Sequence, residues 1–301
     1  LNQINLFYFI IKNASSKIKF DLKLYNKGLV LLGKNISIDK GCVIRVQEKS
    51  SLLIDNNVFI GKDSEIDSNK RISIGAKTTI QSRANIFGDV EILSNCIVGP
   101  NLYVSSYSHE FSKEPSQLIN EQDKFLQNSK PVIINEDCFI GINVFIKPGI
   151  TIGRGSVIGA NTTVLDDVYP YSVVAGNPGK VIKKRFNFLP QDEICSNNSL
   201  NIPYFYKGFV EKRNNKSNLL VKDDIFSIVL NLSKKKKFSL EIYSNFSSSL
   251  GMTRVNKNFF FPIGHSVLEF DIYDFNENFI EFKCINFSKK NILQIIKAKA
   301  Y

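Results

Sequence analysis

Residues 134–164 read INEDCFIGINVFIKPGITIGRGSVIGANTTV, and a branched aliphatic residue recurs at every sixth position of this stretch. The recurring residues are Ile134, Ile140, Ile146, Ile152, Ile158 and Val164. An α-helix repeats every 3.6 residues and a flat strand every 2, so neither produces a strict period of six. A three-sided coil does, because each six-residue step forms one side and directs its aliphatic side chain to the axis. The stretch therefore predicts a parallel β-helix.

The same period occupies an earlier stretch, in which Ile74 is followed by five aliphatic residues at six-residue intervals. They are Ile80, Ile86, Ile92, Val98 and Val104. Looser six-residue steps begin near Leu32, so we expect the coil to span residues 30–187. The period is absent from residues 110–131, which are polar and contain two prolines. A loop of that length inside a regular solenoid is usually functional, so we predict a functional loop insertion there.

The residues before the coil have a helical pattern. Five apolar side chains in residues 1–29 are spaced so that they share one face of a helix. They are Ile4, Phe7, Ile11, Ile18 and Leu22. We therefore predict a short helical lead-in over residues 1–29 that packs on the first turn of the coil.

The residues after the coil have a strand pattern. Segments such as 238–242 and 267–272 alternate apolar and polar residues, and turn-prone stretches separate them. We predict that residues 188–301 form an antiparallel, sandwich-like β domain, and the sequence assigns it no role. The fold class expected for the whole chain is therefore all-β.

The net charge of the chain limits the classes of binding partner. The formal net charge of +11 favours an anionic partner, such as coenzyme phosphates, an acidic glycan or an anionic membrane surface, although solubility alone also explains it. The basic residues are dispersed and no nucleic-acid-binding motif accompanies them, so we expect no nucleic-acid partner.

The five cysteines lack CxxC spacing and suit a reducing compartment. We predict a cytoplasmic protein, with peripheral association at the inner face of the membrane as the alternative.

Three motifs resemble those of the hexapeptide-repeat acyltransferases, specifically the sugar and xenobiotic O-acetyltransferase branch. They are GPNLYVSSYSH at 99–109, the run from IGINVFIKPG at 140 to Val164, and VAGNPGKVI at 174–182. The resemblance covers about residues 30–185 and gives no information on residues 190–301. It implies a left-handed β-helix, a homotrimer, and acetyl-coenzyme A (acetyl-CoA) as the acyl donor.

His109 ends the first motif, where the loop leaves the coil. An alcohol is a poor nucleophile until a base removes its proton, and imidazole titrates near neutrality. A histidine at such a position is more often structural, but the surrounding motif implies that His109 is the general base. Glu110, Glu114 or a backbone carbonyl are candidates for orienting its ring.

The resemblance also implies where the donor binds. It places acetyl-CoA in a groove between neighbouring subunits, along residues 134–165, where Gly141 and Ala160 allow close approach to the backbone. Four basic residues after the coil are candidates for contacting the phosphates of the coenzyme. They are Lys180, Lys183, Lys184 and Arg185. The simpler alternatives are that Gly141 and Ala160 are corner residues and that the basic residues form a solvated tail.

Candidate acceptor-binding residues are Asn85 and Tyr107, together with Phe139, which stands where many relatives carry Trp. Asn85 lies about one coil before Tyr103 on the same corner line. Each is also compatible with a plain corner role, since Asn tolerates left-handed turns.

These residues predict an O-acetyltransferase that moves acetyl directly from acetyl-CoA to a hydroxyl of a bacterial surface carbohydrate, either a capsular polysaccharide or a lipopolysaccharide sugar. The saccharide acceptor would be an acidic polymer if the net charge serves its binding. The alternatives are an N-acetyltransferase of an amino sugar and a non-catalytic carbohydrate-binding β-helix protein. A zinc enzyme of this fold needs three histidines on one metal, and the chain has two, so we expect no metal.

Overall fold

The protein forms two compact units in a computed structural model, Leu1–Arg185 and Phe186–Tyr301. The residues that the structure describes are 16–19, 21–123, 129–186, 189, 191–206, 209–211, 219–221, 225–232, 235, 237–252, 255–271, 279–285 and 292–301. No helix within these ranges is long and apolar enough to cross a membrane.

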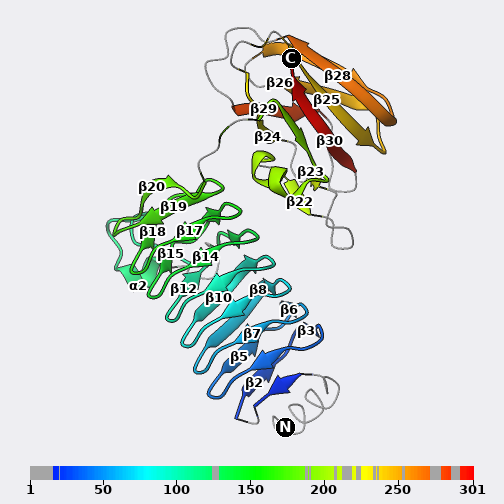
Figure 1. Ribbon diagram of the computed structural model, residues 1–301. Helices are drawn as coiled ribbons and strands as arrows, with labels where there is room; N and C mark the ends of the chain where they lie inside the picture. The colour runs from blue at the N-terminus through cyan, green and yellow to red at the C-terminus, as the bar shows by residue number, and fades with distance from the viewer. Residues whose placement is uncertain are drawn as a thin grey trace. The chain divides into compact units, whose positions relative to one another are not determined.

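The first unit is a coil of short parallel strands that wind around one axis on three faces (Figure 1). The first face contains β1 (Lys17–Ile18), β4 (Ser37–Ile38), β7 (Phe59–Ile60), β9 (Thr79–Ile80), β11 (Ile97–Val98), β14 (Phe139–Ile140), β17 (Val157–Ile158) and β19 (Ser172–Ala175), followed by the antiparallel strand β20 (Lys180–Lys184).

The other two faces meet in two long strands that turn the corner between them, β8 (Glu65–Ile74) and β10 (Asn85–Ile92). The second face also contains β2 (Lys23–Asn26), β5 (Val43–Val46), β12 (Tyr103–Ser105), β15 (Phe145–Ile146) and β18 (Thr163–Val164). The third face also contains β3 (Leu29–Leu32), β6 (Ser51–Ile54), β13 (Val132–Ile134) and β16 (Thr151–Ile152).

The six-residue period produces the core of this coil. On each face the periodic residue of one turn lies in register with that of the next, as Ile80, Val98 and Ile140 do on the first face. These three side chains are fully buried. Burying a side chain of this size is worth about 1.5–3 kcal/mol, so the stacked columns supply the main stabilisation of the coil. The predicted β-helix is confirmed.

The N-terminal boundary of the coil needs a correction. Residues 1–15 of the predicted helical lead-in lie outside the described residues, but strands β1 and β2 show that the coil has begun by Lys17 rather than at residue 30. Ile18 and Leu24 are six residues apart and stack in register on Ile38 and Ile44. The period of six therefore explains Ile18 better than the helical spacing that suggested the lead-in.

The predicted loop insertion is present as an excursion between β12 and β13. It contains one short helix, α2 (Ile119–Gln122). Its two ends meet, because the Lys130 amide donates to the Ser106 carbonyl (2.8 Å) and the Ser106 and Ser129 hydroxyls lie 3.0 Å apart. The coil then resumes in register, with Ile134 beside Ile92. The excursion is therefore a side loop anchored at one corner of an otherwise continuous coil.

The second unit consists of two antiparallel sheets. One contains β21 (Glu193–Cys195), β22 (Phe209–Glu211), β23 (Leu219–Val221), β25 (Lys237–Ser244), β28 (Gly264–Asp271) and β30 (Leu293–Ala300). The other contains β24 (Ile225–Val229), β26 (Ser248–Met252), β27 (Val255–Phe261) and β29 (Phe279–Cys284), and a 3₁₀ helix, η2 (Ser199–Tyr204), follows β21.

Aromatic side chains from both sheets form the core of the second unit. Phe238 and Phe270 of the first sheet stack with ring centroids 4.7 Å apart, and both contact Phe282 of the second sheet. All three rings are buried. The predicted antiparallel β structure after the coil is confirmed.

Candidate active site

His109 lies on the excursion, four residues after β12 ends at the corner between the second and third faces. Its side chain is 66% exposed. Its ring Nδ1 lies 2.5 Å from Oδ2 of Asp123, a residue that is only 18% exposed and directly follows α2. The two residues are 14 positions apart in sequence, so the fold of the excursion itself makes the pair.

Asp123 orients His109 through both of its oxygens. Oδ2 faces the imidazole, and Oδ1 accepts a hydrogen bond from the Glu110 amide at 3.1 Å. A carboxylate only accepts, so the ring nitrogen that faces it carries a proton. This assignment makes Nε2 the basic nitrogen of the neutral ring. The arrangement is a base with a carboxylate that fixes its orientation and tautomer.

The two carboxylates that sequence reasoning considered as orienting groups have other partners. Glu110 lies 3.0 Å from the ammonium of Lys113 and accepts from Ser112, and this ion pair lowers the pKa of Glu110. Glu114 accepts a hydrogen bond from the Ser116 hydroxyl at 2.8 Å. Sequence reasoning missed Asp123, because its closeness to His109 depends on how the chain returns from the excursion.

Tyr107 lies at the base of the same loop, against a glycine. A Cβ built on Gly88 would lie 2.7 Å from Cζ of Tyr107 and closer still to the Ser106 hydroxyl, so the ring fits only because position 88 has no side chain. Burial raises the pKa of Tyr107 well above its usual value, and Asp67 and Asp89 add to the rise. The phenol is therefore a proton donor at neutral pH.

This packing predicts that Gly88→Ala is destabilising by about 1–3 kcal/mol and moves the start of the loop, because the methyl group overlaps both Ser106 and Tyr107. Gly264→Ala is the matched control. Gly264 has a similar backbone angle (φ +100° against +94°), but no atom lies within 4 Å of its Cβ position. Thermal unfolding of both variants measures the difference. Equal loss of stability in the two would mean that Tyr107 does not press on position 88.

Asn85 lies on β10 in register with Tyr103 of β12, as the sequence spacing indicated. The outer surface beside it is aromatic: Tyr103 stacks on Phe145 (5.7 Å between ring centroids) and meets Phe87 edge-on (5.8 Å). These rings belong to the second face of the coil. They form an exposed stripe that sequence reasoning did not single out.

The other candidates lie on different parts of the coil. Phe139 is exposed on the first face, in register with Ile97, and therefore does not share a face with Asn85. Gly141 is buried beneath the next turn, where a Cβ would lie 2.6 Å from the Ala160 amide nitrogen. Coil spacing alone thus requires a glycine at 141. Ala160 is exposed at the corner above it.

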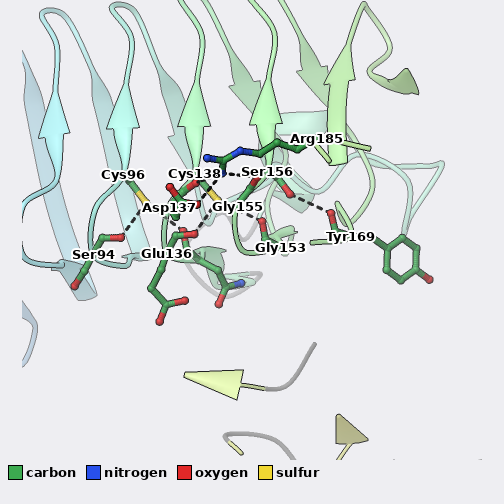
Figure 2. A network of polar contacts seen from close by, with 11 residues as sticks. Ser94, Cys96, Glu136, Asp137, Cys138, Gly153, Gly155, Ser156, Tyr169 and Arg185 are labelled. Carbon is green, nitrogen blue, oxygen red and sulfur yellow. Dashed lines mark hydrogen bonds and ion pairs between the residues drawn. The ribbon is translucent and has the colours of Figure 1, made fainter. Parts of the chain in front are cut away.

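The four basic candidates divide into two groups. Lys180, Lys183 and Lys184 belong to β20, and all residues of this strand are exposed. Arg185 instead contacts corner residues of the coil (Figure 2). Its Nη1 donates to the Asp137 carboxylate at 2.7 Å and to the Gly155 carbonyl at 3.0 Å. The three lysines thus share one strand, whereas Arg185 has a structural partner.

Comparison with known proteins identifies the coil. The family model described as a hexapeptide repeat of succinyl-transferase matches residues 131–166. WcaF of Escherichia coli (strain K12), whose name assigns it to acetyl transfer in colanic acid biosynthesis, is 28% identical over 134 residues, which are 44% of this chain and 69% of WcaF. A chloramphenicol acetyltransferase of Agrobacterium fabrum is 41% identical over 87 residues, which are 29% of this chain and 41% of that enzyme.

Among solved structures, a hexapeptide-repeat acetyltransferase of Vibrio cholerae in complex with acetyl-CoA is 26% identical, with a TM-score of 0.37 over 45% of this chain and 72% of that one. The sequence matches and the confirmed six-residue coil agree, and acetyltransferases recur among the relatives. The matched part of the coil is therefore a hexapeptide repeat, and the chain is similar to acetyltransferases.

Proposed function

We propose that this protein is an O-acetyltransferase that transfers acetyl from acetyl-CoA to a hydroxyl of a bacterial surface carbohydrate. The observation that carries the proposal is the pairing of His109 with Asp123 on a loop beside the coil. The similarity to WcaF supports a polysaccharide as the acceptor. The alternative, transfer to the nitrogen of an amino sugar, uses the same base and donor and differs only in the acceptor.

In the proposed reaction, Nε2 of His109 removes the proton of the acceptor hydroxyl while its oxygen attacks the thioester carbonyl. Asp123 holds the ring and stabilises the imidazolium that forms. Backbone N–H groups stabilise the oxyanion, and the coenzyme thiolate leaves and takes the proton back from Nε2. The acetyl group passes directly between the substrates.

A covalent route through cysteine has little support in the described residues. Cys42, Cys96 and Cys138 are buried inside the coil. Burial raises the pKa of Cys42, and a hydrogen bond with Cys96 together with burial raises the pKa of Cys138. A thiol attacks as its thiolate, so these shifts make both groups poor nucleophiles.

The exposed position of His109 supports a shared site. We assign the second wall of the site to a neighbouring subunit of a homotrimer, with acetyl-CoA bound between the coils near Ala160. Lys180, Lys183 and Lys184 would contact its phosphates by charge-assisted hydrogen bonds. On the acceptor side we assign Tyr107 as a donor to the sugar and Asn85 as a further contact, whereas Phe139, on another face of the coil, would reach the acceptor only from the neighbouring subunit.

The proposal is tested by measuring the release of free thiol from acetyl-CoA in the presence of single acceptors. The panel contains neutral hexoses, amino sugars, and base-deacetylated capsular and lipopolysaccharide glycans. We expect release only with acceptors that offer a hydroxyl, with an ester as product. Release only with amino sugars would replace the proposal by N-acetylation. No release with any acceptor, and no thermal shift with coenzyme A, would favour a non-catalytic carbohydrate-binding protein.

A further inference from the structure

The second unit presents two aromatic rings side by side on the outer face of the sheet that contains β25, β28 and β30. Along β25, Phe238, Leu240, Ile242 and Ser244 point into the core. Tyr243 therefore lies on the outer face, where it is 39% exposed. His265 of β28 is its in-register partner, and the two ring centroids lie 5.2 Å apart with an angle of 58° between the planes.

The rows that follow these rings along the sheet, on the side away from the exposed Ile263, are mixed rather than apolar. Gln294 of β30 lies in register with Tyr243 on the other side. The next row of the outer face joins Glu241 to Val267 and Lys297, and the row after that joins Ser239 to Glu269 and Lys299. Val267 is the one exposed aliphatic of these rows, at 64%. We call this surface, from Tyr243 and His265 through the two following rows, the Tyr243 face.

A further tyrosine lies at the far end of the Tyr243 face. The Tyr301 hydroxyl donates to the Glu269 carboxylate at 2.8 Å, and this hydrogen bond raises the pKa of Tyr301. The backbone of Tyr301 pairs with that of Lys237, six residues before Tyr243. At about 3.3 Å per residue, the backbone separation of the two tyrosines is roughly 20 Å.

We propose that the Tyr243 face binds an extended saccharide, in which the Tyr243 and His265 rings stack on the C–H face of a sugar. The inference rests on the proposed function in one respect: it makes the bound saccharide the polymer that the coil acetylates. The chemistry favours a sugar over a protein partner. A protein interface has a contiguous apolar centre with few charges, whereas here ring faces alternate with donors and acceptors that suit hydroxyl groups.

Binding is tested without acetyl-CoA, so that it does not depend on catalysis. The probe is a printed array of base-deacetylated bacterial capsular and lipopolysaccharide glycans. We expect wild-type protein to bind at least one glycan, and Tyr243→Ala and His265→Ala each to weaken that binding about tenfold. Phe260→Ala is the matched control, because it removes a ring that is 67% exposed on the other sheet. Absence of glycan binding, or equal binding by all variants, would overturn the proposal.

In a second measurement, the NMR signals of the two histidines distinguish binding at the coil from binding at the Tyr243 face. The chain has only two, His109 in the coil unit and His265 on the Tyr243 face. In protein labelled with ¹³C at the histidine Cε1, we expect the array-selected glycan to shift the His265 resonance and coenzyme A to leave it unmoved. A shift confined to His109 would place the glycan at the coil instead. Dissociation of the oligomer by Tyr243→Ala, seen in sedimentation, would make the face a contact between copies and also overturn the proposal.

If the proposed function is wrong and this inference is right, glycan binding on the array and the His265 shift are both observed, but no thiol is released. If this inference is wrong and the proposed function is right, thiol is released from acetyl-CoA with a monosaccharide acceptor, but the protein binds no glycan on the array. The two failures are therefore distinguishable.

Discussion

His109→Ala is expected to lower kcat/KM for acetyl transfer about 10²- to 10⁴-fold, the usual contribution of a general base. The loss follows from the chemistry of the acceptor, because a sugar hydroxyl retains its proton at neutral pH unless a base removes it. The fold should not change. The His109 side chain is largely exposed, so its removal leaves no cavity in the core of the coil. Thiol release measures the activity, and thermal unfolding with sedimentation checks fold and assembly.

Lys113→Ala is the control for His109→Ala. Lys113 lies on the same loop, is equally exposed, and pairs only with Glu110 among the ion pairs of the described residues. Such surface pairs contribute about 0–1 kcal/mol, so this variant should keep near wild-type activity. If His109→Ala keeps wild-type turnover, His109 has no part in the reaction. If Lys113→Ala loses as much as His109→Ala, the loop matters for its shape and not for the imidazole.

Asp123→Asn is expected to lower kcat/KM roughly 10²- to 10⁴-fold, because an amide in place of the carboxylate favours the imidazole tautomer that cannot act as the base. Asp123 accepts two N–H donors, one on each oxygen: His109 Nδ1–H and the Glu110 amide. Asparagine has one acceptor oxygen and an NH₂ group that only donates. One of the two donors therefore loses its acceptor. Where the NH₂ faces the ring, the imidazole proton moves to Nε2 and the base is lost.

Glu110→Gln is the matched comparison, because it neutralises the carboxylate next to His109 in sequence. Its partners are Lys113 and Ser112 rather than the ring, so its effect on kcat/KM should be small. Steady-state kinetics of both variants decide which carboxylate orients His109. A large loss for Glu110→Gln with none for Asp123→Asn would reverse the assignment.

The coil could be predicted from the sequence because its determinants are local and repeat. Each aliphatic residue needs only the residue one turn away, and the chain returns to that position after 16 to 22 residues in an uninterrupted turn, as Ile80 does on Val98. The start of the coil was harder to predict, since Ile18 fits both a helical spacing and a six-residue step. The register on Ile38 decides between them.

The candidate site could be predicted only in part, because its partners come from irregular chain. A motif marks His109, but three other acidic residues precede Asp123 in the excursion. Nothing in the spacing of these four residues favours Asp123 as the partner of His109. Arg185 illustrates the same difficulty. Its charge suggested a phosphate contact, whereas the close of the coil puts its guanidinium against Asp137, 48 residues earlier. Contacts between residues that lie far apart in irregular segments leave no periodic pattern in the sequence.

We propose that the His109–Asp123 pair on the coil transfers acetyl to a sugar hydroxyl. The most direct measurement uses acetyl-CoA labelled with ¹³C at the acetyl carbonyl, a saccharide acceptor selected from the panel, and NMR of the saccharide product. We expect an ester carbonyl signal that grows with thiol release, disappears in mild alkali, and is absent with His109→Ala. An alkali-stable amide signal, or labelled acetate with no labelled saccharide, would contradict it.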